Sequence, residues 1–421
     1  MQASKSSTRT EIIGSLIMKY FITTKEGPMI KNLGLSDSDT KYINIIDSLV
    51  AEMDENEIKD IESKGFVVEK EGDYFIPQPI FSPHLQNVDY YPNSELNPKT
   101  PGSMKQMVST GVVKLREMGI LGSESVHVGI ADSGIDGTHP DIMNNIKSFK
   151  DFIDINNTKP IDPGAHGSAV ASILCGNGHY TEKFHGVAPK CSLSVARVMN
   201  EKGEGRESVI LQGVDWLVDQ GVSIINLSLG SWLTRYTPFS RAVDNLVDRG
   251  IVVLVAAGND GPKQITAPAN AVNAITCAAC NYEGEFADFS SLGPAKGPDV
   301  LTIDKPDIMA WGKDVAMARA KGTTMGNIIN DNYIYASGTS FATPFVAGCV
   351  VLMKSLKPEL SPLEIKKILM ETALDNRSYD KYHEGAGTVR IYDAIAKLEG
   401  VAPSKPEVKG KGCLLSLIGL R

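Results

Sequence analysis

The chain contains the stretch Ala336-Ser337-Gly338-Thr339-Ser340-Phe341-Ala342-Thr343-Pro344, and a nearly unbroken apolar run over 345–353 follows it. This pattern predicts a long, buried helix with Ser340 at its N-terminus and Pro344 in its first turn, where a missing N–H costs little. Unpaired amides and the positive end of the helix dipole meet at such a position, which suits a developing negative charge. By itself, Gly-Thr-Ser before a helix is more often an ordinary helix cap than a reactive site.

Three further residues occupy comparable positions. A buried strand is predicted to end at Asp132, and His166 opens an apolar helix that reaches residue 175. A second buried strand, over 251–257, ends just before Asn259. In open parallel sheets, chemistry gathers at the carboxyl ends of strands and at the adjoining helix N-termini, so we expect these residues to meet.

Each of these residue types has a defined part in acyl transfer. A serine hydroxyl is a poor nucleophile at neutral pH and needs a base, for which His166 is the candidate. Asp132 would hold the imidazole in the right tautomer, and the Asn259 amide and the Ser340 backbone N–H would donate to an oxyanion. Taken singly, an aspartate after a strand or a lone histidine is usually structural. The combination, in the order Asp, His, Ser, predicts a nucleophilic serine site.

The segments Asp132-Ser-Gly, His166-Gly-Ser and Gly338-Thr-Ser340-Phe-Ala-Thr-Pro resemble the three signatures of subtilisin-like serine proteases. The resemblance extends from about Ser109 to Ala396. It implies an α/β fold, a doubly wound and mostly parallel sheet flanked by helices. It also implies a serine endopeptidase that hydrolyses extended polypeptide segments through an acyl-enzyme and requires no cofactor for its chemistry.

The resemblance further implies where a polypeptide substrate binds. One side of the substrate would pair with an edge strand at Ser228, Leu229 and Gly230, and the other side with Gly203, Glu204 and Gly205. Such pairing uses backbone hydrogen bonds for affinity and side-chain pockets for selectivity. The alternative for these segments is a plain sheet edge and a surface turn.

Acidic side chains near these segments raise a question of substrate preference. Glu201, Glu204 and Glu207, together with Trp232, could narrow the groove and favour basic substrate residues. Surface glutamates are more often simply solvated. The sequence leaves both interpretations open.

The first hundred residues predict a separate small domain. Strands are expected over 19–24 and 48–53, a helix over 54–64, and a closing strand pair formed by 66–71 and 73–76. This order resembles the inhibitory propeptide domain of the same family, with an unrelated α+β module as the alternative. The predicted division of the chain is an N-terminal extension (1–17), a propeptide-like α+β domain (18–78), a linker (79–104), the catalytic domain (105–400) and a C-terminal tail (401–421).

A propeptide-like domain implies that the protein is made as a zymogen. The domain would cover the substrate strands and act as an intramolecular inhibitor, and its exit chain could lie in the cleft as a pseudo-substrate. The Pro-rich stretch that begins at Ile76 is typical of a linker. We therefore expect autocatalytic cleavage between Phe75 and Met104.

Composition excludes several other classes. The 421 residues carry a formal net charge of −8, which argues against general nucleic-acid binding. No segment approaches the roughly 18 unbroken apolar residues of a membrane helix. Residues 1–21 lack the pattern of a signal peptide. We therefore predict a cytoplasmic protein without a membrane span, with export by a non-standard route as the alternative.

The positions of cysteines and carboxylates indicate whether the chain has a zinc or a calcium site. Cys277-Ala-Ala-Cys280 has the spacing of half a zinc site but lacks a second pair, so we interpret both cysteines as core residues. Asp141 matches a calcium ligand of the resembled family, and 176–184 takes the place of a calcium-binding loop. The loop offers few carboxylates, whereas calcium takes six to eight oxygens. A structural calcium at Asp141 is possible, with a helix cap as the alternative.

Two further hypotheses concern activity. A catalytically silent protein could keep the peptide groove, although such a scaffold has no need of Asp132, His166, Ser340 and Asn259 together. Among active enzymes, a processing protease with one client is the alternative to a general degradative protease.

Overall fold

The computed structural model describes residues 18–24, 40–46, 48–80, 107, 109–180, 184–375 and 379–400. The chain divides into two compact units, 1–71 and 72–421. The predicted extension (1–17), the tail (401–421) and linker residues 81–104 lie outside the described residues. The predicted domain boundaries stay predictions, and the division between the units falls after Glu71 rather than after residue 78.

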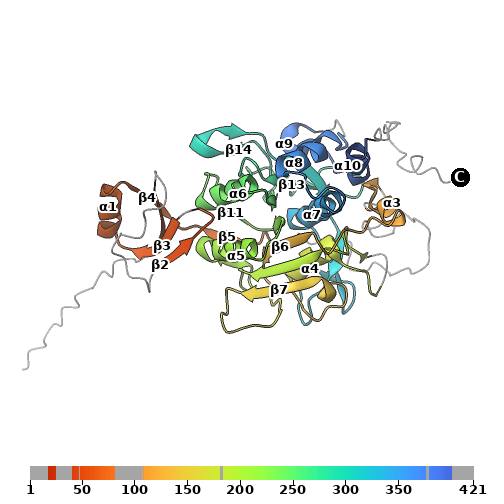
Figure 1. Cartoon of the computed structure of the whole chain (residues 1–421), viewed down its shortest axis with the longest axis horizontal. Coiled ribbons are helices and arrows are strands. Elements are labelled where there is room, and N and C mark those ends of the chain that lie inside the picture. Colours follow the sequence, from red (N-terminus) through yellow and green to blue (C-terminus); the bar gives the residue numbers. More distant parts are fainter. Residues whose placement is uncertain are drawn as a thin grey trace, which may run out of the picture. The chain divides into compact units, whose positions relative to one another are not determined.

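In its described residues, the first unit is a four-stranded antiparallel sheet with one helix (Figure 1). Its elements are β1 (Met18–Thr24), β2 (Thr40–Ile43), β3 (Ser48–Met53), α1 (Glu55–Ser63) and β4 (Phe66–Lys70), with the strand order β2-β3-β1-β4. Helix α1 starts with a capping box, because Asp54 accepts from the Glu57 N–H and the Glu57 side chain accepts from the Asp54 N–H. Its inner face contributes Ile61 to a small apolar core with Ile22, Ala51 and Met53.

The prediction that residues 66–71 and 73–76 form a closing strand pair is wrong. Strand β4 pairs with β1, whereas β5 (Asp73–Phe75) belongs to the second unit. There it lies between β9 (Glu204–Arg206) and β11 (Gly230–Ser231), antiparallel to both. An alternating sequence pattern predicts a strand but does not say which edge the strand will join.

The second unit is built on a seven-stranded sheet in the order β16-β13-β12-β10-β6-β8-β7. Its strands are β6 (His127–Asp132), β7 (Ile146–Asp151), β8 (Ser192–Arg197), β10 (Ile224–Leu227), β12 (Val252–Ala256), β13 (Ile275–Cys280) and β16 (Ile308–Trp311). Every neighbouring pair is parallel. The apolar runs of these strands follow from burial on both faces.

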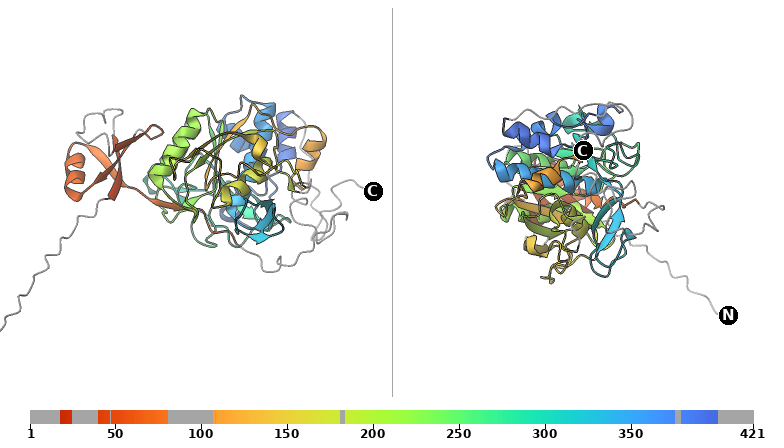
Figure 2. Two further views of the ribbon diagram at one scale, coloured as in Figure 1. Left: turned by 90° about the horizontal axis from the view of Figure 1, so that it is seen from below. Right: turned by 90° about the vertical axis from the view of Figure 1, so that its right-hand side faces the viewer.

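Helices cover both faces of this sheet (Figures 1 and 2), which confirms the predicted fold class. Helices α4 (His166–Cys175) and α7 (Thr339–Leu356) share a core cluster with Val128 and Ile130 of β6. Gly129, between those two residues, lies against Leu217 of α5 on the other face. Helix α5 (Glu207–Asp219) packs there with α6 (Pro238–Asp248).

Shorter elements complete the second unit. They are α3 (Val112–Glu117), η3 (Met143–Asn145), β14 (Ala295–Lys296), η5 (Pro298–Val300), β15 (Thr302–Ile303), β17 (Val315–Ala318), β18 (Asn327–Ile328), β19 (Tyr333–Ala336), α8 (Pro362–Glu371), α9 (Lys381–Glu384) and α10 (Ile391–Leu398).

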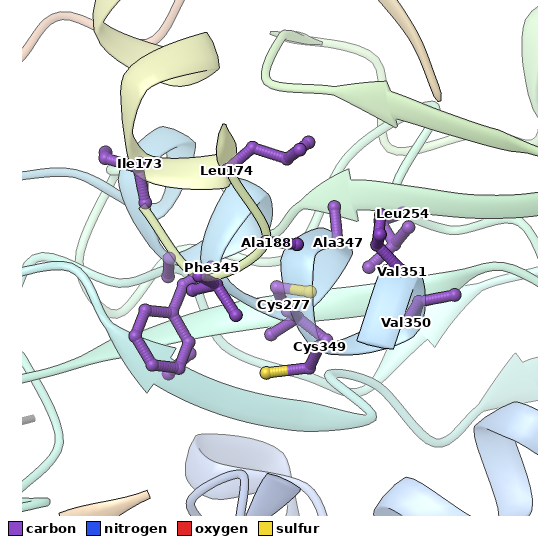
Figure 3. Close-up of a cluster of buried hydrophobic side chains, with 14 of the residues drawn as sticks. Ile173, Leu174, Ala188, Leu254, Cys277, Phe345, Ala347, Cys349, Val350 and Val351 are labelled. Atoms are coloured by element: carbon purple, nitrogen blue, oxygen red, sulfur yellow. The ribbon is translucent and has the colours of Figure 1, made fainter. Parts of the chain in front are cut away.

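Helix α7 is the buried helix that the sequence predicts. It starts at Thr339, so Pro344 lies inside the helix and not in its first turn, which corrects the prediction. The apolar side chains of α7 pack on Leu254 of β12 and Cys277 of β13 (Figure 3). The helix has the length and composition of a membrane span, but 89% of it is buried inside the protein, as in a core helix.

Strand β13 buries both cysteines of the Cys-Ala-Ala-Cys sequence. Cys277 and Cys280 are free and fully buried, which confirms their interpretation as core residues. Burial raises the pKa of the Cys280 thiol to about 12, so it is not a reactive thiolate at neutral pH.

Close packing of α7 can be tested at Gly348. A Cβ atom there would lie 2.5 Å from Val187 Cβ, so we expect Gly348→Val to lower the free energy of unfolding by about 1–3 kcal/mol. Urea denaturation measures this free energy, with Gly348→Val made in a Ser340→Ala chain that cannot digest itself. Ser355→Val, at a half-buried position near the end of the same helix, is the matched control and should cost less. Equal losses would contradict the close approach at Gly348.

Candidate active site

The predicted site residues collect at the carboxyl ends of three adjacent strands. Strand β6 ends at Asp132, and Ser228 follows β10, its neighbour in the sheet. Asn259 follows β12, the next strand along. His166 and Ser340 lie in the first turns of α4 and α7. The sheet order thus brings together residues that are far apart in the sequence.

Asp132 and His166 form a buried pair. The Nδ1 atom of His166 lies 2.9 and 3.0 Å from the two carboxylate oxygens of Asp132. The exposed fractions are 0% for Asp132 and 2% for His166, so solvent does not compete for this contact. A proton on Nδ1 leaves Nε2 as the nitrogen able to accept a proton.

The Ser340 hydroxyl does not bond to His166 in this structure. Ser340 Oγ donates to the Ser228 carbonyl at 3.3 Å, and His166 Nε2 has no hydrogen-bond partner among the described residues. The predicted contact between hydroxyl and imidazole therefore requires rotation of the serine side chain. Catalytic hydrogen bonds are often unformed before a substrate is bound productively.

Pro344 has a specific consequence for the Ser340 main chain. In a regular helix the residue at 344 would donate its N–H to the Ser340 carbonyl, but proline has no N–H. The freed carbonyl instead accepts from Ser228 Oγ at 2.8 Å. Ser228 itself is held by Asn226, whose Nδ2 donates to its hydroxyl at 2.9 Å. The proline therefore ties the first turn of α7 to the end of β10.

Asn259 has a fixed orientation. Its Oδ1 accepts from both the backbone N–H and the hydroxyl of Thr339, each at 2.9 Å. The Nδ2 group consequently points the other way and donates to the Gln78 carbonyl at 3.4 Å. The second predicted oxyanion donor, the backbone N–H of Ser340, belongs to the same first turn of α7.

Most of the predicted substrate-binding residues contact the chain's own segment 73–80. Glu204 and Gly205 pair with β5 on one side, and Gly230 pairs with it on the other. Beyond β5, the Gly203 carbonyl accepts from the Ile76 N–H at 2.8 Å. Ser228 and Leu229 are buried between β10 and β11 and lie outside this ladder.

The segment continues past Asn259. The Ile80 N–H donates to the Ser337 carbonyl at 2.8 Å, and the Ser337 N–H donates to the Ile80 carbonyl at 3.0 Å. The chain is thus held by backbone hydrogen bonds on both sides of Gln78, in the extended form expected of a bound peptide.

Asp162 is a functional candidate that sequence reasoning missed. Its Oδ1 accepts from Ser133 Oγ, and its Oδ2 accepts from the N–H and the hydroxyl of Ser168, each at 2.7 Å. Ser133 in turn donates its N–H to Asp132 at 2.7 Å. Burial raises the pKa of Asp162. The carboxylate therefore joins the loop that carries Asp132 to the helix that begins with His166.

Asp141, the predicted calcium candidate, is satisfied by protein donors. Its Oδ1 accepts from the His179 N–H at 2.7 Å, and its Oδ2 accepts from the Tyr333 hydroxyl at 2.8 Å. Within the described parts of the chain, no group of three or more His, Cys, Asp or Glu side chains could hold a metal. Calcium needs six to eight oxygen ligands, and the described residues around Asp141 do not fit such an ion. Residues 181–183 of the predicted calcium-binding loop lie outside the residues that the structure describes.

Comparison with known proteins agrees with this geometry. The Subtilase family profile matches residues 123–391. Serine protease AprX of Bacillus subtilis (strain 168) is 31% identical over 298 residues, 65% of this chain and 67% of that protein. Subtilisin NAT of Bacillus subtilis subsp. natto is 29% identical over 401 residues, 93% of this chain and 92% of its own. An alkaline protease of Alkalihalobacillus alcalophilus is 32% identical over 288 residues, 67% of this chain and 69% of that protein.

The chain therefore belongs to the subtilase family. It is a serine endopeptidase that acts on polypeptides and needs no cofactor for its chemistry. The alternative of a catalytically silent binding protein is set aside.

Asp162→Asn tests the link between the loop that carries Asp132 and helix α4. The asparagine would turn an N–H₂ group towards donors that need an acceptor, so the loop and the helix should shift apart. We expect kcat to fall about 10- to 100-fold with little change in KM, because small misplacements of catalytic groups cost rate. Steady-state peptide hydrolysis measures both constants.

The matched control is Asp244→Asn. Asp244 is a buried carboxylate on α6 that accepts from the Tyr236 hydroxyl and from the Val272 and Asn273 N–H groups. This variant should lower thermal stability without lowering kcat. If both variants lose kcat equally, Asp162 has only a general structural role.

Proposed function

We propose that Asp132, His166 and Ser340 are the catalytic triad, with Asn259 in the oxyanion site, and that the protein is made as a zymogen inhibited by its own N-terminal segment. The Asp132–His166 pair and the fixed orientation of the Asn259 amide support the catalytic assignment. The segment bound beside Asn259 supports the zymogen assignment.

The geometry supports an acyl-enzyme mechanism. Ser340 Oγ rotates away from Ser228, gives its proton to His166 Nε2 and attacks the substrate carbonyl carbon. Asp132 keeps the proton on Nδ1 and stabilises the imidazolium that forms. Asn259 Nδ2 and the Ser340 N–H donate to the oxyanion, His166 then protonates the leaving amine, and water hydrolyses the acyl-enzyme. General-base help is typically worth about 10²- to 10⁴-fold.

The observation that carries the zymogen proposal is the hydrogen bond from Asn259 to the Gln78 carbonyl. This carbonyl takes the place of a substrate carbonyl, and β5 pairs with both predicted substrate strands. The alignment with Subtilisin NAT covers 93% of this chain, so it reaches into the first unit.

The bond that follows Gln78 is a poor substrate for this chemistry. Its nitrogen belongs to Pro79 and carries a ring carbon where an ordinary amide carries hydrogen. The proton from His166 must reach that nitrogen, and the ring restricts the approach. Segment 73–80 would therefore bind as a substrate does and be cut slowly there.

Pro79→Ala tests this register. We expect the variant to cleave itself after Gln78, because an ordinary amide would then face Ser340. Intact mass spectrometry of the full-length chain detects the new terminus, and Pro79→Ala combined with Ser340→Ala is the uncleaved control. In the wild type, we expect cleavage elsewhere between Phe75 and Met104 to yield a mass that Ser340→Ala lacks. Identical masses in all variants would refute self-processing.

Asn259→Asp tests the oxyanion assignment. Aspartate keeps the acceptor that Thr339 needs but removes the Nδ2 donor, so the fold should persist while activity falls. We expect kcat/KM to drop at least about 10²-fold. The assay is peptide hydrolysis by chains whose Ser340 reacts with a fluorophosphonate probe. Wild-type activity in a folded Asn259→Asp variant would contradict the assignment.

The cytoplasmic location, with export by a non-standard route as the alternative, is also a proposal and rests on the sequence. Fractionation of cells followed by immunoblotting for the chain decides between the two.

A further inference from the structure

Tyr74 of β5 fills a buried pocket of the second unit. Its exposed fraction is 1%, and its ring meets the Phe239 ring edge-on with centroids 5.3 Å apart. The pocket is polar at the end that receives the hydroxyl. The Tyr74 oxygen lies 3.3 Å from Glu207 Oε1 and 3.0 Å from Thr237 Oγ1.

Glu207 is a buried carboxylate and not the solvated surface residue that its sequence context favours. Its exposed fraction is 0%, and burial raises its pKa. Its Oε1 also accepts from the Phe239 N–H, and its Oε2 accepts from the Gly72 N–H, both at 2.9 Å. Glu207 is the first residue of α5, and Phe239 is in the first turn of α6. Two helix N-termini therefore offset the carboxylate charge.

The two oxygens around the Tyr74 hydroxyl are complementary to it. The Glu207 carboxylate is an acceptor, so the Tyr74 hydroxyl donates its hydrogen bond to Glu207. Thr237 Oγ1 caps α6 by accepting from the Ser240 N–H at 3.2 Å, and its own proton is able to reach the phenolic oxygen. A tyrosine hydroxyl satisfies both groups, whereas a phenylalanine ring would leave a buried carboxylate short of a donor.

We propose that this pocket selects substrates with a tyrosine at the position that Tyr74 takes, four residues before Gln78. The inference rests on the proposed function, because the pocket opens to substrates only when segment 73–80 leaves. The substrate class is then polypeptides whose extended segments carry a tyrosine at this distance before the cleaved bond.

Neighbouring contacts do not supply this selectivity. Phe75 stacks on Trp232 at a centroid distance of 4.4 Å, but Trp232 is 64% exposed and this contact involves no hydroxyl group. A basic side chain is also a poor match for the pocket. The Glu207 carboxylate accepts the Phe239 N–H at the start of α6 and itself lies at the start of α5, so its charge does not require a cation.

The test uses two peptides and the full-length chain. One peptide copies residues 73–80 with alanine in place of Pro79, and the other differs from it only by phenylalanine in place of Tyr74. Rates are normalised to the fraction of Ser340 that a fluorophosphonate probe labels. We expect kcat/KM to favour the tyrosine peptide by about 10- to 100-fold, the usual effect of leaving a buried polar group unpaired.

Variants assign the preference to the pocket. Glu207→Gln keeps the side-chain shape but removes the charge, and Thr237→Val removes the hydroxyl. Each should bring the preference for tyrosine down several-fold. Thr237→Ser keeps the hydroxyl, so this variant should retain the preference for the tyrosine peptide. Phe75→Leu, in the chain's own segment, should retain the preference as well. Thermal unfolding checks that each variant is folded.

The outcomes separate the inference from the function beneath it. Equal cleavage of the two peptides, a preference for a third peptide with lysine at this position, or a preference that survives both Glu207→Gln and Thr237→Val would overturn the inference while leaving a working protease. Absence of cleavage together with an unlabelled Ser340 would remove the proposed function, and the inference would fall with it.

Discussion

The first turn of α7 must be held against the ends of three strands, and the rest of the site depends on this attachment. Apolar packing holds the helix on the sheet, with Gly348 close to Val187. Hydrogen bonds from Thr339 to Asn259 and from Ser228 to the Ser340 carbonyl attach its first turn to the strand ends. Pro344 favours the second bond, because it leaves the Ser340 carbonyl without its usual helical N–H donor. One attachment thus positions both Ser340 and the Asn259 amide, which we propose as nucleophile and oxyanion donor.

Two buried carboxylates of this protein, Asp162 and Glu207, are stabilised in the same way. Asp162 accepts from an N–H in the first turn of α4, and Glu207 lies where α5 and α6 begin. Burial raises the pKa of each, while helix ends and hydroxyl donors favour the charged form. Each carboxylate also joins two segments that are separate in sequence. Charges placed in this way orient the loops that they join.

Several features could be predicted from sequence because they depend on local periodicity and on chain order. The buried strands, the apolar helix after Ser340 and the partnership of Asp132 with His166 are of this kind. The pairing of β5 could not be predicted, since alternation is the same whichever edge a strand joins. Asp162 resembles any turn aspartate before a helix, and only its contacts show the link to Asp132.

The burial of Glu207 is another feature that could not be predicted from the sequence. In sequence, an acidic residue in the first turn of a helix is typical of a solvated surface. It is buried in contact with Tyr74 and Phe239, which are remote in the chain, so no local pattern reveals its burial. The position of Pro344 is a similar case, because the helix extends further towards its N-terminus than the proline suggests.

The three-stranded arrangement of β9, β5 and β11 has a consequence for solubility. An unpaired strand edge presents a row of N–H and C=O groups that can template association with another chain. While β5 is in place, the facing edges of Glu204–Arg206 and Gly230–Ser231 are covered. Once it departs, both become exposed at the same moment. In the zymogen that we propose, the backbone atoms that bind peptides after this departure are therefore the same atoms that can pair with another copy of the chain at high concentration.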